Sequence, residues 1–154
     1  MAQNVQEAVL KGMGIIFLHS SHRSKPFRLL MGTAGELSWC ERGDCEYIWK
    51  CNPAHPIARN IKGVFLKVDN DETYCEPFGI PEPDELVFIT SYGGGEVIRS
   101  GCCYRRGYGK IFYFQPGHET YPVFYNQNVQ QVIINAVNWA VSEFRREEIV
   151  CRRL

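Results

Sequence analysis

The segment 15–22, Ile-Ile-Phe-Leu-His-Ser-Ser-His, constrains the fold more than any other part of the chain. Its apolar half predicts a buried strand, although periodicity alone does not exclude a helix. Residues 23–31 then show helical spacing, with Phe27, Leu30 and Met31 on one face. Residues 19–22 should therefore lie where a strand ends and a helix begins. Open α/β sheets bind ligands at this position, and free helical N–H groups there favour an anion.

Further strands and helices are expected along the rest of the chain, which indicates an α/β protein. The last helix has the clearest signal, because apolar residues from Val129 to Phe144 follow a 3.6-residue period and Asn126 or Asn128 precedes them as a cap. Arg145 and Arg146 suit the negative end of its dipole. The other expected helices are 5–9, ending near Gly12, and 25–31, and the expected strands are 15–18, 64–68, 85–90, 96–99 with an extension over 102–105, and 110–115.

Two segments depart from this simple pattern. Residues 37–41 and 46–51 predict two short strands joined by Arg42-Gly43-Asp44, which indicates a β-hairpin inserted into the α/β pattern. Residues 69–83 are polar and contain several prolines, which predicts a surface loop. In such a loop Asp71 would be a solvated carboxylate, whereas Glu72 could be an acid, a base or a ligand.

Length and composition favour one ordinary globular domain over residues 1–154. The 17 basic and 17 acidic residues balance, which argues against nucleic-acid binding through a basic field. No apolar run is long enough for a membrane span, and the N-terminus lacks the pattern of a signal peptide, so we expect a cytoplasmic protein. The seven cysteines are then expected to be free thiols, with Cys102 and Cys103 on opposite faces of a strand.

Several short blocks, taken together in their order and spacing, resemble the trehalose-utilisation (ThuA-like) family. This family has the fold of class I glutamine amidotransferases, and the resemblance extends from Gly12 to Val141. The matching blocks are Gly-Met-Gly-Ile-Ile-Phe-Leu-His-Ser-Ser-His (12–22), Leu-Met-Gly-Thr (30–33), His-Pro-Ile (55–57), Asp-Glu-Thr-Tyr (71–74), Gly-Lys-Ile-Phe-Tyr-Phe-Gln-Pro-Gly-His-Glu (109–119) and Asn-Ala-Val-Asn-Trp-Ala (135–140).

The resemblance implies a flavodoxin-like three-layer sandwich with a mostly parallel sheet and helices on both faces. It also implies that the chain corresponds to the C-terminal part of the family's fold, so that the domain is truncated at its N-terminus. Either the chain is a fragment, or a homo-oligomer or another subunit covers the open edge of the sheet, because an uncovered edge invites aggregation.

The resemblance further implies a role in sugar metabolism, with keto-disaccharides or glycosides as small-molecule ligands. Amidotransferases carry a nucleophilic cysteine at the strand-to-helix elbow, but His19 and Ser20 stand here, so we predict no glutaminase activity. An isomerase, a lyase and a hydrolase of oxidised sugars all remain open. The alternative, from a different functional class, is a non-catalytic carbohydrate-binding or assembly subunit of the same fold.

The candidate catalytic residues are His19, His118, Glu72 and Glu119, with His118-Glu119 resembling the basic element of amidotransferases. A zinc-type ion is the metal-assisted version, with His19, His22 and His118 as ligands beside a carboxylate. The structural alternative makes these histidines turn residues whose ring nitrogens bond to backbone carbonyls, and spacing alone favours it.

Candidate substrate-binding residues are Ser20, Ser21, His22 and Tyr74. Ser20 could also be a nucleophile beside His118, but a ligand contact or a helix cap is the favoured interpretation. His55 precedes a proline and is interpreted as structural. Cysteines 40, 45 and 51 lack a Cys-x-x-Cys pair, so they give little indication of a zinc cluster.

Overall fold

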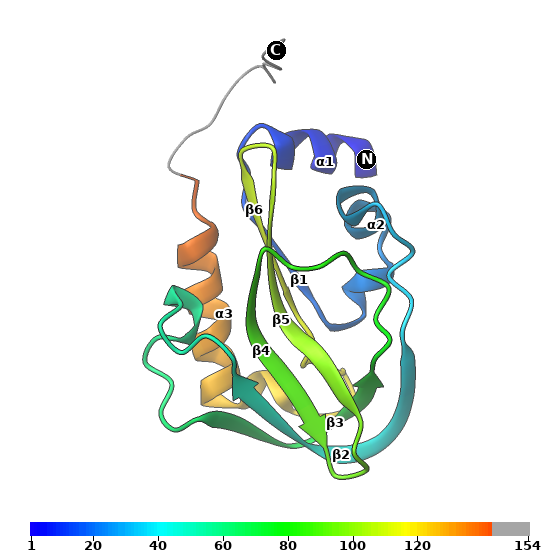
Figure 1. The fold of residues 1–154 in the computed structure, drawn as a ribbon, viewed down its shortest axis with the longest axis vertical. Coiled ribbons are helices and arrows are strands. Elements are labelled where there is room, and N and C mark those ends of the chain that lie inside the picture. The colour runs from blue at the N-terminus through cyan, green and yellow to red at the C-terminus, as the bar shows by residue number, and fades with distance from the viewer. Residues whose placement is uncertain (143–154) are drawn as a thin grey trace.

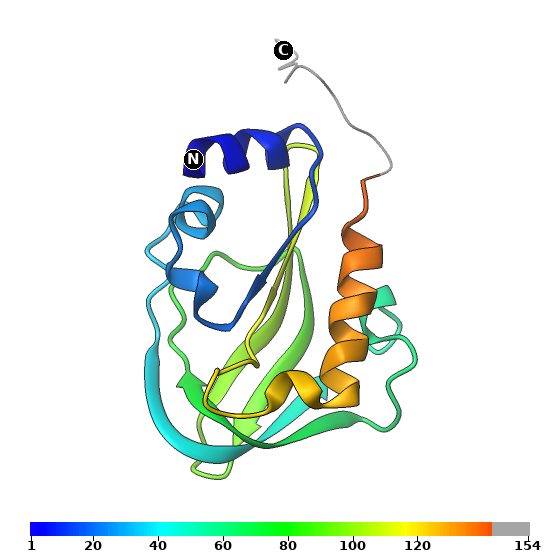
Figure 2. The same ribbon diagram turned by 180° about the vertical axis from the view of Figure 1, so that it is seen from behind.

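The computed structural model describes residues 1–142 of the chain (Figures 1 and 2). Helices and strands alternate at first, and a run of strands follows before the last helix. The elements are α1 (Ala2–Leu10), β1 (Ile15–Leu18), α2 (Lys25–Met31), β2 (Ser38–Lys50), β3 (Phe65–Cys75), β4 (Glu85–Tyr92), β5 (Val97–Arg106), β6 (Gly109–Phe114) and α3 (Gln127–Ala140). Short 3-10 helices cover His19–Arg23, Pro56–Ala58 and Val123–Tyr125.

The six strands form one mixed sheet in the order β1-β6-β5-β4-β2-β3. Among the strands of residues 1–142, only β1 and β6 pair in parallel, and the other neighbouring pairs are antiparallel. The expectation of a mostly parallel sheet is therefore wrong. The short connections 93–96 and 107–108 allow only antiparallel neighbours, because a parallel connection needs a crossover of a dozen or more residues.

The predicted β-hairpin at 37–51 does not form, because these residues make the single long strand β2. Gly43 has a φ of 67°, and the register with β3 shifts on both sides of Asp44. The residues expected to turn the chain back instead form an irregularity that bends one strand, as β-bulges do. Figure 1 shows the resulting curve of β2 around the lower part of the molecule.

The loop predicted for residues 69–83 is also wrong in its first part, because β3 continues through the polar residues to Cys75. Asp71 and Glu72 are buried there, and Asp71 accepts three backbone hydrogen bonds. Tertiary contacts therefore override the weak strand preference of an Asp-Asn-Asp-Glu sequence.

The elements around the first strand agree with the predictions. Strand β1 covers residues 15–18, and α2 begins after Ser24, whose hydroxyl accepts a hydrogen bond from the N–H of Phe27 at 3.3 Å. The amide oxygen of Asn126 accepts from the N–H of Asn128 at 2.9 Å and caps α3. The helix ends at Ala140, before the expected Phe144, and Phe144 and the two arginines lie outside the described residues.

Two hydrophobic clusters cover opposite faces of the sheet. One packs α1 and α2 against strand residues such as Tyr113, and the other packs α3 against Phe112 and Phe114. Consecutive β6 residues enter different clusters because side chains alternate across a strand. Cys102 and Cys103 likewise lie on opposite faces of β5, as predicted.

None of the helices in residues 1–142 has the length and apolar character needed to cross a bilayer.

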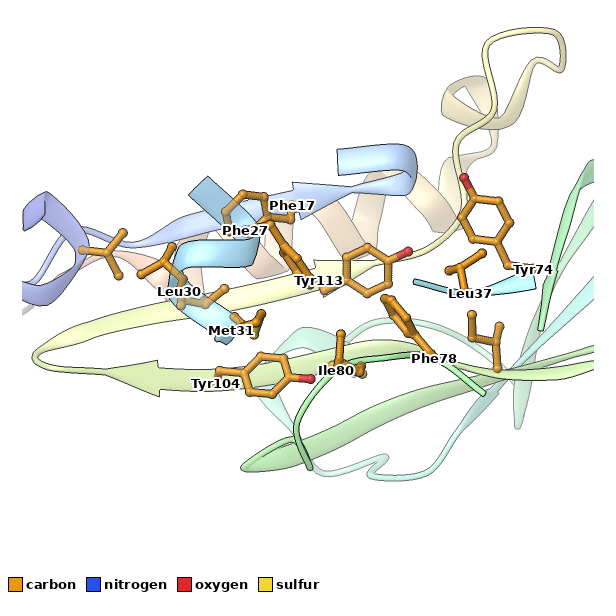
Figure 3. Close-up of a cluster of buried hydrophobic side chains, with 14 of the residues drawn as sticks. Phe17, Phe27, Leu30, Met31, Leu37, Tyr74, Phe78, Ile80, Tyr104 and Tyr113 are labelled. Carbon is orange, nitrogen blue, oxygen red and sulfur yellow. The ribbon is translucent and has the colours of Figure 1, made fainter. Parts of the chain in front are cut away.

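The cluster under α2 extends toward the end of β1. Phe17 and Phe27 meet edge to face with ring centroids 5.0 Å apart, and Tyr113 lies between Phe27 and Phe78. Figure 3 shows Tyr74 at one end of this cluster. The packed core therefore continues directly into the region where the predicted site residues lie.

Candidate functional site

Three elements distant in sequence meet at the end of β1. His19 begins the 3-10 helix after β1, Glu72 lies in β3, and His118 follows β6. One ligand atom from each of these side chains lies within 4.8 Å of the others. His19 also has a φ of 47°, a conformation that is uncommon outside glycine and often found at functional sites.

The tautomer of His19 is fixed by the backbone. Its Nδ1 lies 3.0 Å from the carbonyl oxygen of Gln115, in a buried contact. A carbonyl oxygen only accepts hydrogen bonds, so Nδ1 carries a hydrogen and donates it. When His19 is neutral, its Nε2 therefore presents a lone pair to the site.

His118 is held in the opposite tautomer. Its Nδ1 accepts a hydrogen bond from the backbone N–H of Thr120 at 3.2 Å. The ring hydrogen of neutral His118 is consequently on Nε2. The two rings meet edge to face with centroids 5.4 Å apart, so one presents a lone pair and the other an N–H to the same space.

Glu72 lies between the two imidazoles. Its Oε2 is 3.0 Å from Nε2 of His19 and 3.9 Å from Nε2 of His118, and the His19 and Glu72 side chains are only 6% and 7% exposed. Nε2 of neutral His19 and a carboxylate oxygen are both acceptors, so their short separation offers a place for one proton or a cation between them. The pair can thus hold or release one proton in a nearly dry environment.

Tyr74 completes the wall beside His19. The two rings are stacked, with centroids 4.9 Å apart, and the Tyr74 hydroxyl lies 3.3 Å from Nε2 of His19. Burial, followed by the charge of Glu72, raises the pKa of Tyr74 well above its usual range. The phenol therefore stays protonated and can act as a hydrogen-bond donor.

Asp71 supports the site from behind, so its interpretation as a solvated loop carboxylate is wrong. It is fully buried and accepts from the N–H groups of Glu72 at 2.8 Å, Gly117 at 3.0 Å and His118 at 3.1 Å. These bonds tie the turn after β6 to β3. Asp71 therefore fixes the distance between Glu72 and His118.

A second buried polar layer contacts this support. The Tyr92 hydroxyl lies 3.0 Å from Oε1 of Glu46, 3.1 Å from Oε1 of Gln115 and 3.3 Å from the Glu72 carbonyl oxygen. Burial and the neighbouring charge of Asp71 raise the pKa of Glu46 well above its usual range, which favours the neutral form of this carboxyl. The sequence analysis missed Glu46, although it stands two residues before the core residue Ile48 on the same strand face.

These groups open into a cavity of about 220 Å³. Its mouth carries polar and aromatic side chains, and Trp39, which is 55% exposed, is a further residue that the sequence analysis missed. The lining residues are His19, Ser20, His22, Arg23, Trp39, Glu72, Tyr74, His118 and Glu119. A larger hollow of about 800 Å³ lies beside α1 and α2, but Lys25 and Arg28 are its only charged lining residues, and it offers no acid–base pair.

Several predicted site residues lie at the margin of the cluster or outside it. Nδ1 of His22 bonds to the carbonyl oxygen of Gly35 at 2.7 Å, and its ring packs against Tyr74 and Phe78, so it is not part of the three-ligand group. Ser20 and Glu119 line the cavity but are exposed, and Ser21 does not line it.

Burial affects the titration of two histidines away from the cluster. It lowers the pKa of His22 and of His55, whose Nδ1 accepts from the N–H of Ile57 at 3.2 Å.

The six cysteines in the described part of the chain are free thiols, as predicted. Cys40, Cys45 and Cys51 are not among the residues grouped as a metal site there.

We compared the chain with known proteins, and both a protein family and solved structures of similar fold match it. The sequence profile named ThuA, described as trehalose utilisation, matches residues 1–140. No curated protein matches the chain. Solved structures do match, but at identities low enough that their likeness concerns the fold alone.

A ThuA-like protein from Bacteroides uniformis superposes with a TM-score of 0.67 at 18% identity, covering 93% of this chain and 64% of its own. A ThuA-like protein from Parabacteroides merdae superposes with a TM-score of 0.70 at 14% identity, covering 96% of this chain and 67% of its own. A cytoplasmic protein from Salmonella typhimurium superposes with a TM-score of 0.63 at 10% identity, covering 92% of this chain and 61% of its own. The chain thus spans about two thirds of the length of these relatives.

Proposed function

The chain belongs to the trehalose-utilisation (ThuA) family, and from this premise we propose that its cavity binds a keto-disaccharide or a related glycoside and performs acid–base chemistry beside the ketone. The family connects the chain with sugar metabolism. The arrangement of His19, Glu72 and His118 supports the finer proposal, because it provides a proton acceptor and a proton donor in one small cavity.

The opposite tautomers of the two histidines carry this proposal. The His19–Glu72 pair can accept a proton between Nε2 and Oε2, which lie 3.0 Å apart. His118 presents its Nε2–H from the other side of the same carboxylate. General acid–base catalysis needs such a pair within reach of both the carbon acid and the carbonyl oxygen of a substrate.

The proposed first step removes a proton from the carbon next to the ketone. The C–H bond breaks and its proton goes to the His19–Glu72 pair. The electrons of that bond form a carbon–carbon double bond to the ketone carbon. The former ketone oxygen then receives the Nε2 hydrogen of His118, which gives an enediol. Returning the proton to the neighbouring carbon would isomerise the sugar. Expelling a glycosidic oxygen from that intermediate would instead cleave the glycoside, so both outcomes share this step.

Deuterium exchange tests this step directly. Trehalose oxidised to a ketone on one ring would be incubated with the protein in D2O and followed by NMR. We expect the hydrogen beside the ketone to exchange, and His118→Ala and Glu72→Gln to slow the exchange by about 100-fold or more. His55→Asn is the matched control, because this buried histidine lies outside the cavity and its substitution should leave the exchange unchanged.

The other outcomes separate the functional classes. Binding of the keto-sugar without exchange would favour the non-catalytic carbohydrate-binding alternative. Absence of binding by thermal shift, where a ligand of the native state should raise the melting temperature, would overturn the proposal of a sugar site.

A divalent ion of the zinc type is a second candidate for this site, supported by the three ligand atoms within 4.8 Å. Two imidazoles and one carboxylate, with a cavity on the open side, match the donor set of catalytic zinc sites. To bind through Nε2, His118 would have to move its ring hydrogen to Nδ1 and give up the hydrogen bond from the Thr120 N–H. Such an ion would polarise the ketone. Near-stoichiometric metal in purified protein, lost in His19→Ala but retained in His22→Ala, would support it, and trace metal in the wild type would exclude it.

A further inference from the structure

The cavity is too small to enclose both rings of a disaccharide. Its volume of about 220 Å³ is below the range of about 300–1,000 Å³ typical of sites that enclose drug-sized ligands. One sugar ring placed beside His19 and Glu72 would therefore leave the second ring outside. That ring would lie at the mouth, against the residues that border it.

Trp39 is at this mouth. It pairs in register with Tyr74 across β2 and β3, and directly opposed residues of antiparallel strands carry their side chains on one face. Tyr74 stacks on His19 inside the cavity, whereas the neighbouring Trp39 is 55% exposed. The two aromatic side chains thus lead from the acid–base pair to the outside.

Trp39 differs from the other tryptophans in having no partner. Trp49 donates its indole N–H to Oγ of Ser91 at 2.9 Å and packs on Phe65, and Trp139 packs on His55 with the ammonium of Lys110 over its ring. Within residues 1–142, no ring, cation or hydrogen bond engages the Trp39 indole. An amphipathic side chain of this kind is typical of contact surfaces that become covered.

We propose that Trp39 forms an outer subsite that stacks on the second ring of a disaccharide whose first ring occupies the cavity. This inference rests on the proposed sugar function. A sugar ring presents C–H groups on one face and hydroxyl groups at its edge, so the indole face covers the C–H groups. Ser20, Arg23 and Glu119, which also line the cavity, supply polar partners for the hydroxyls.

Two probes that differ by one ring test this subsite. They are trehalose oxidised to a ketone on one ring, and methyl glucoside oxidised at the same position. Binding to the wild type, Trp39→Ala and Trp39→Phe would be measured by calorimetry. We expect Trp39→Ala to weaken the two-ring probe about tenfold while changing the one-ring probe by less than about twofold, and Trp39→Phe to retain most of the affinity.

Trp49→Ala is the matched control. Trp49 lies on the same strand and is also partly exposed, but ten residues at about 3.3 Å each place it far along β2 from the cavity. It should bind both probes like the wild type. Because Trp39 is exposed and unpartnered, its variants should keep the melting temperature of the wild type.

The outcomes distinguish this inference from the function on which it rests. If the wild type binds both probes and Trp39→Ala weakens them equally, or weakens neither, the outer subsite is wrong while the sugar site stands. If the wild type binds neither probe, the sugar function fails and the subsite fails with it.

Discussion

The two ends of the sheet are built differently. At the covered end, formed by β1, β5 and β6, helices pack on both faces, and residues 111–114 of β6 are all fully buried. At the curled end, formed by β2 and β3, burial alternates where residues 46–49 pair with residues 65–68. Ile48 and Leu66 are buried, whereas their neighbours Trp49 and Phe65 are 40% and 37% exposed.

The site lies where these two ends meet. The covered end supplies His19 and His118 from the ends of parallel neighbours, and the curled end supplies Glu72, Tyr74 and Trp39. The rigid, doubly packed part therefore holds the imidazoles, and the bend in β2 and β3 brings the carboxylate and the aromatic side chains over them. Neither end forms the site alone.

The largest effect should come from truncating a residue buried on the covered end. Phe112 is fully buried and stacks with Phe114 at a centroid distance of 5.9 Å. Phe112→Ala should lower the free energy of unfolding by about 3–5 kcal/mol, because it removes transfer energy and leaves a cavity. Urea denaturation measures this loss. A loss of less than about 1 kcal/mol would contradict the doubly covered packing.

The link between the two ends should be the next most sensitive position. Asp71→Asn replaces a carboxylate that accepts three backbone N–H groups with an amide that has only one acceptor oxygen. We expect the free energy of unfolding to fall by about 2–3 kcal/mol, in the range of hydrogen bonds to charged groups.

Amide hydrogen exchange tests the local part of this prediction. In Asp71→Asn, the N–H groups of Gly117 and His118 should exchange faster than in the wild type, while those of β6 keep their protection. Unchanged protection at 117 and 118 would show that Asp71 does not hold the turn. Asp69→Asn is the matched control, because this side chain of β3 is exposed and bonds only to Lys67.

How far the sequence predicted the structure also differs between the two ends. The strand at 15–18, the helix at 25–31 and the cap at Asn126 are confirmed, because local apolar patterns and cap chemistry determine them. At the curled end, a bulge at Gly43 was predicted as a turn and residues 69–75 as a loop. Both segments are strands because β2 and β3 pair with each other, and a local sequence pattern does not contain the partners of such a pairing.

The candidate site shows the same division. Two histidines placed after strands could be found from the sequence, since strand ends next to a helix are where ligands bind. The contacts of Asp71, Glu46 and Trp39 could not, because they depend on the bend of β2 and β3 and on the register between them. The functional roles of these residues are predictions, and the experiments described above would test them.

A smaller effect is expected from a histidine of the covered end when the pH falls. Burial lowers the pKa of His22, so below the ordinary value of about 6.5 the unfolded chain binds a proton that the folded chain does not. Stability is therefore fully present above that pH and is lost as the pH falls toward the folded pKa.

The variant His22→Gln isolates this contribution. The free energy of unfolding, measured at pH 7.5 and 5.5, should decrease less on acidification in the variant than in the wild type. Part of the pH dependence of stability that remains in the variant should come from His55, whose pKa is also lowered by burial. An unchanged pH dependence would show that His22 does not contribute to acid destabilisation.

The smallest effect should come from Phe65→Ala at the curled end, which is the counterpart of Phe112→Ala. Phe65 is 37% exposed and contacts Trp49 and Tyr47 across β2 and β3, with ring centroids 4.8 and 5.5 Å apart. Each cross-strand aromatic pair contributes about 0.2–1 kcal/mol, so losing two of them should cost no more than about 2 kcal/mol on urea denaturation, below the loss expected for Phe112→Ala. A loss as large as that of Phe112→Ala would mean that this face is buried in solution. Stability that rises with protein concentration would then identify another copy of the chain as its cover, because association stabilises by mass action.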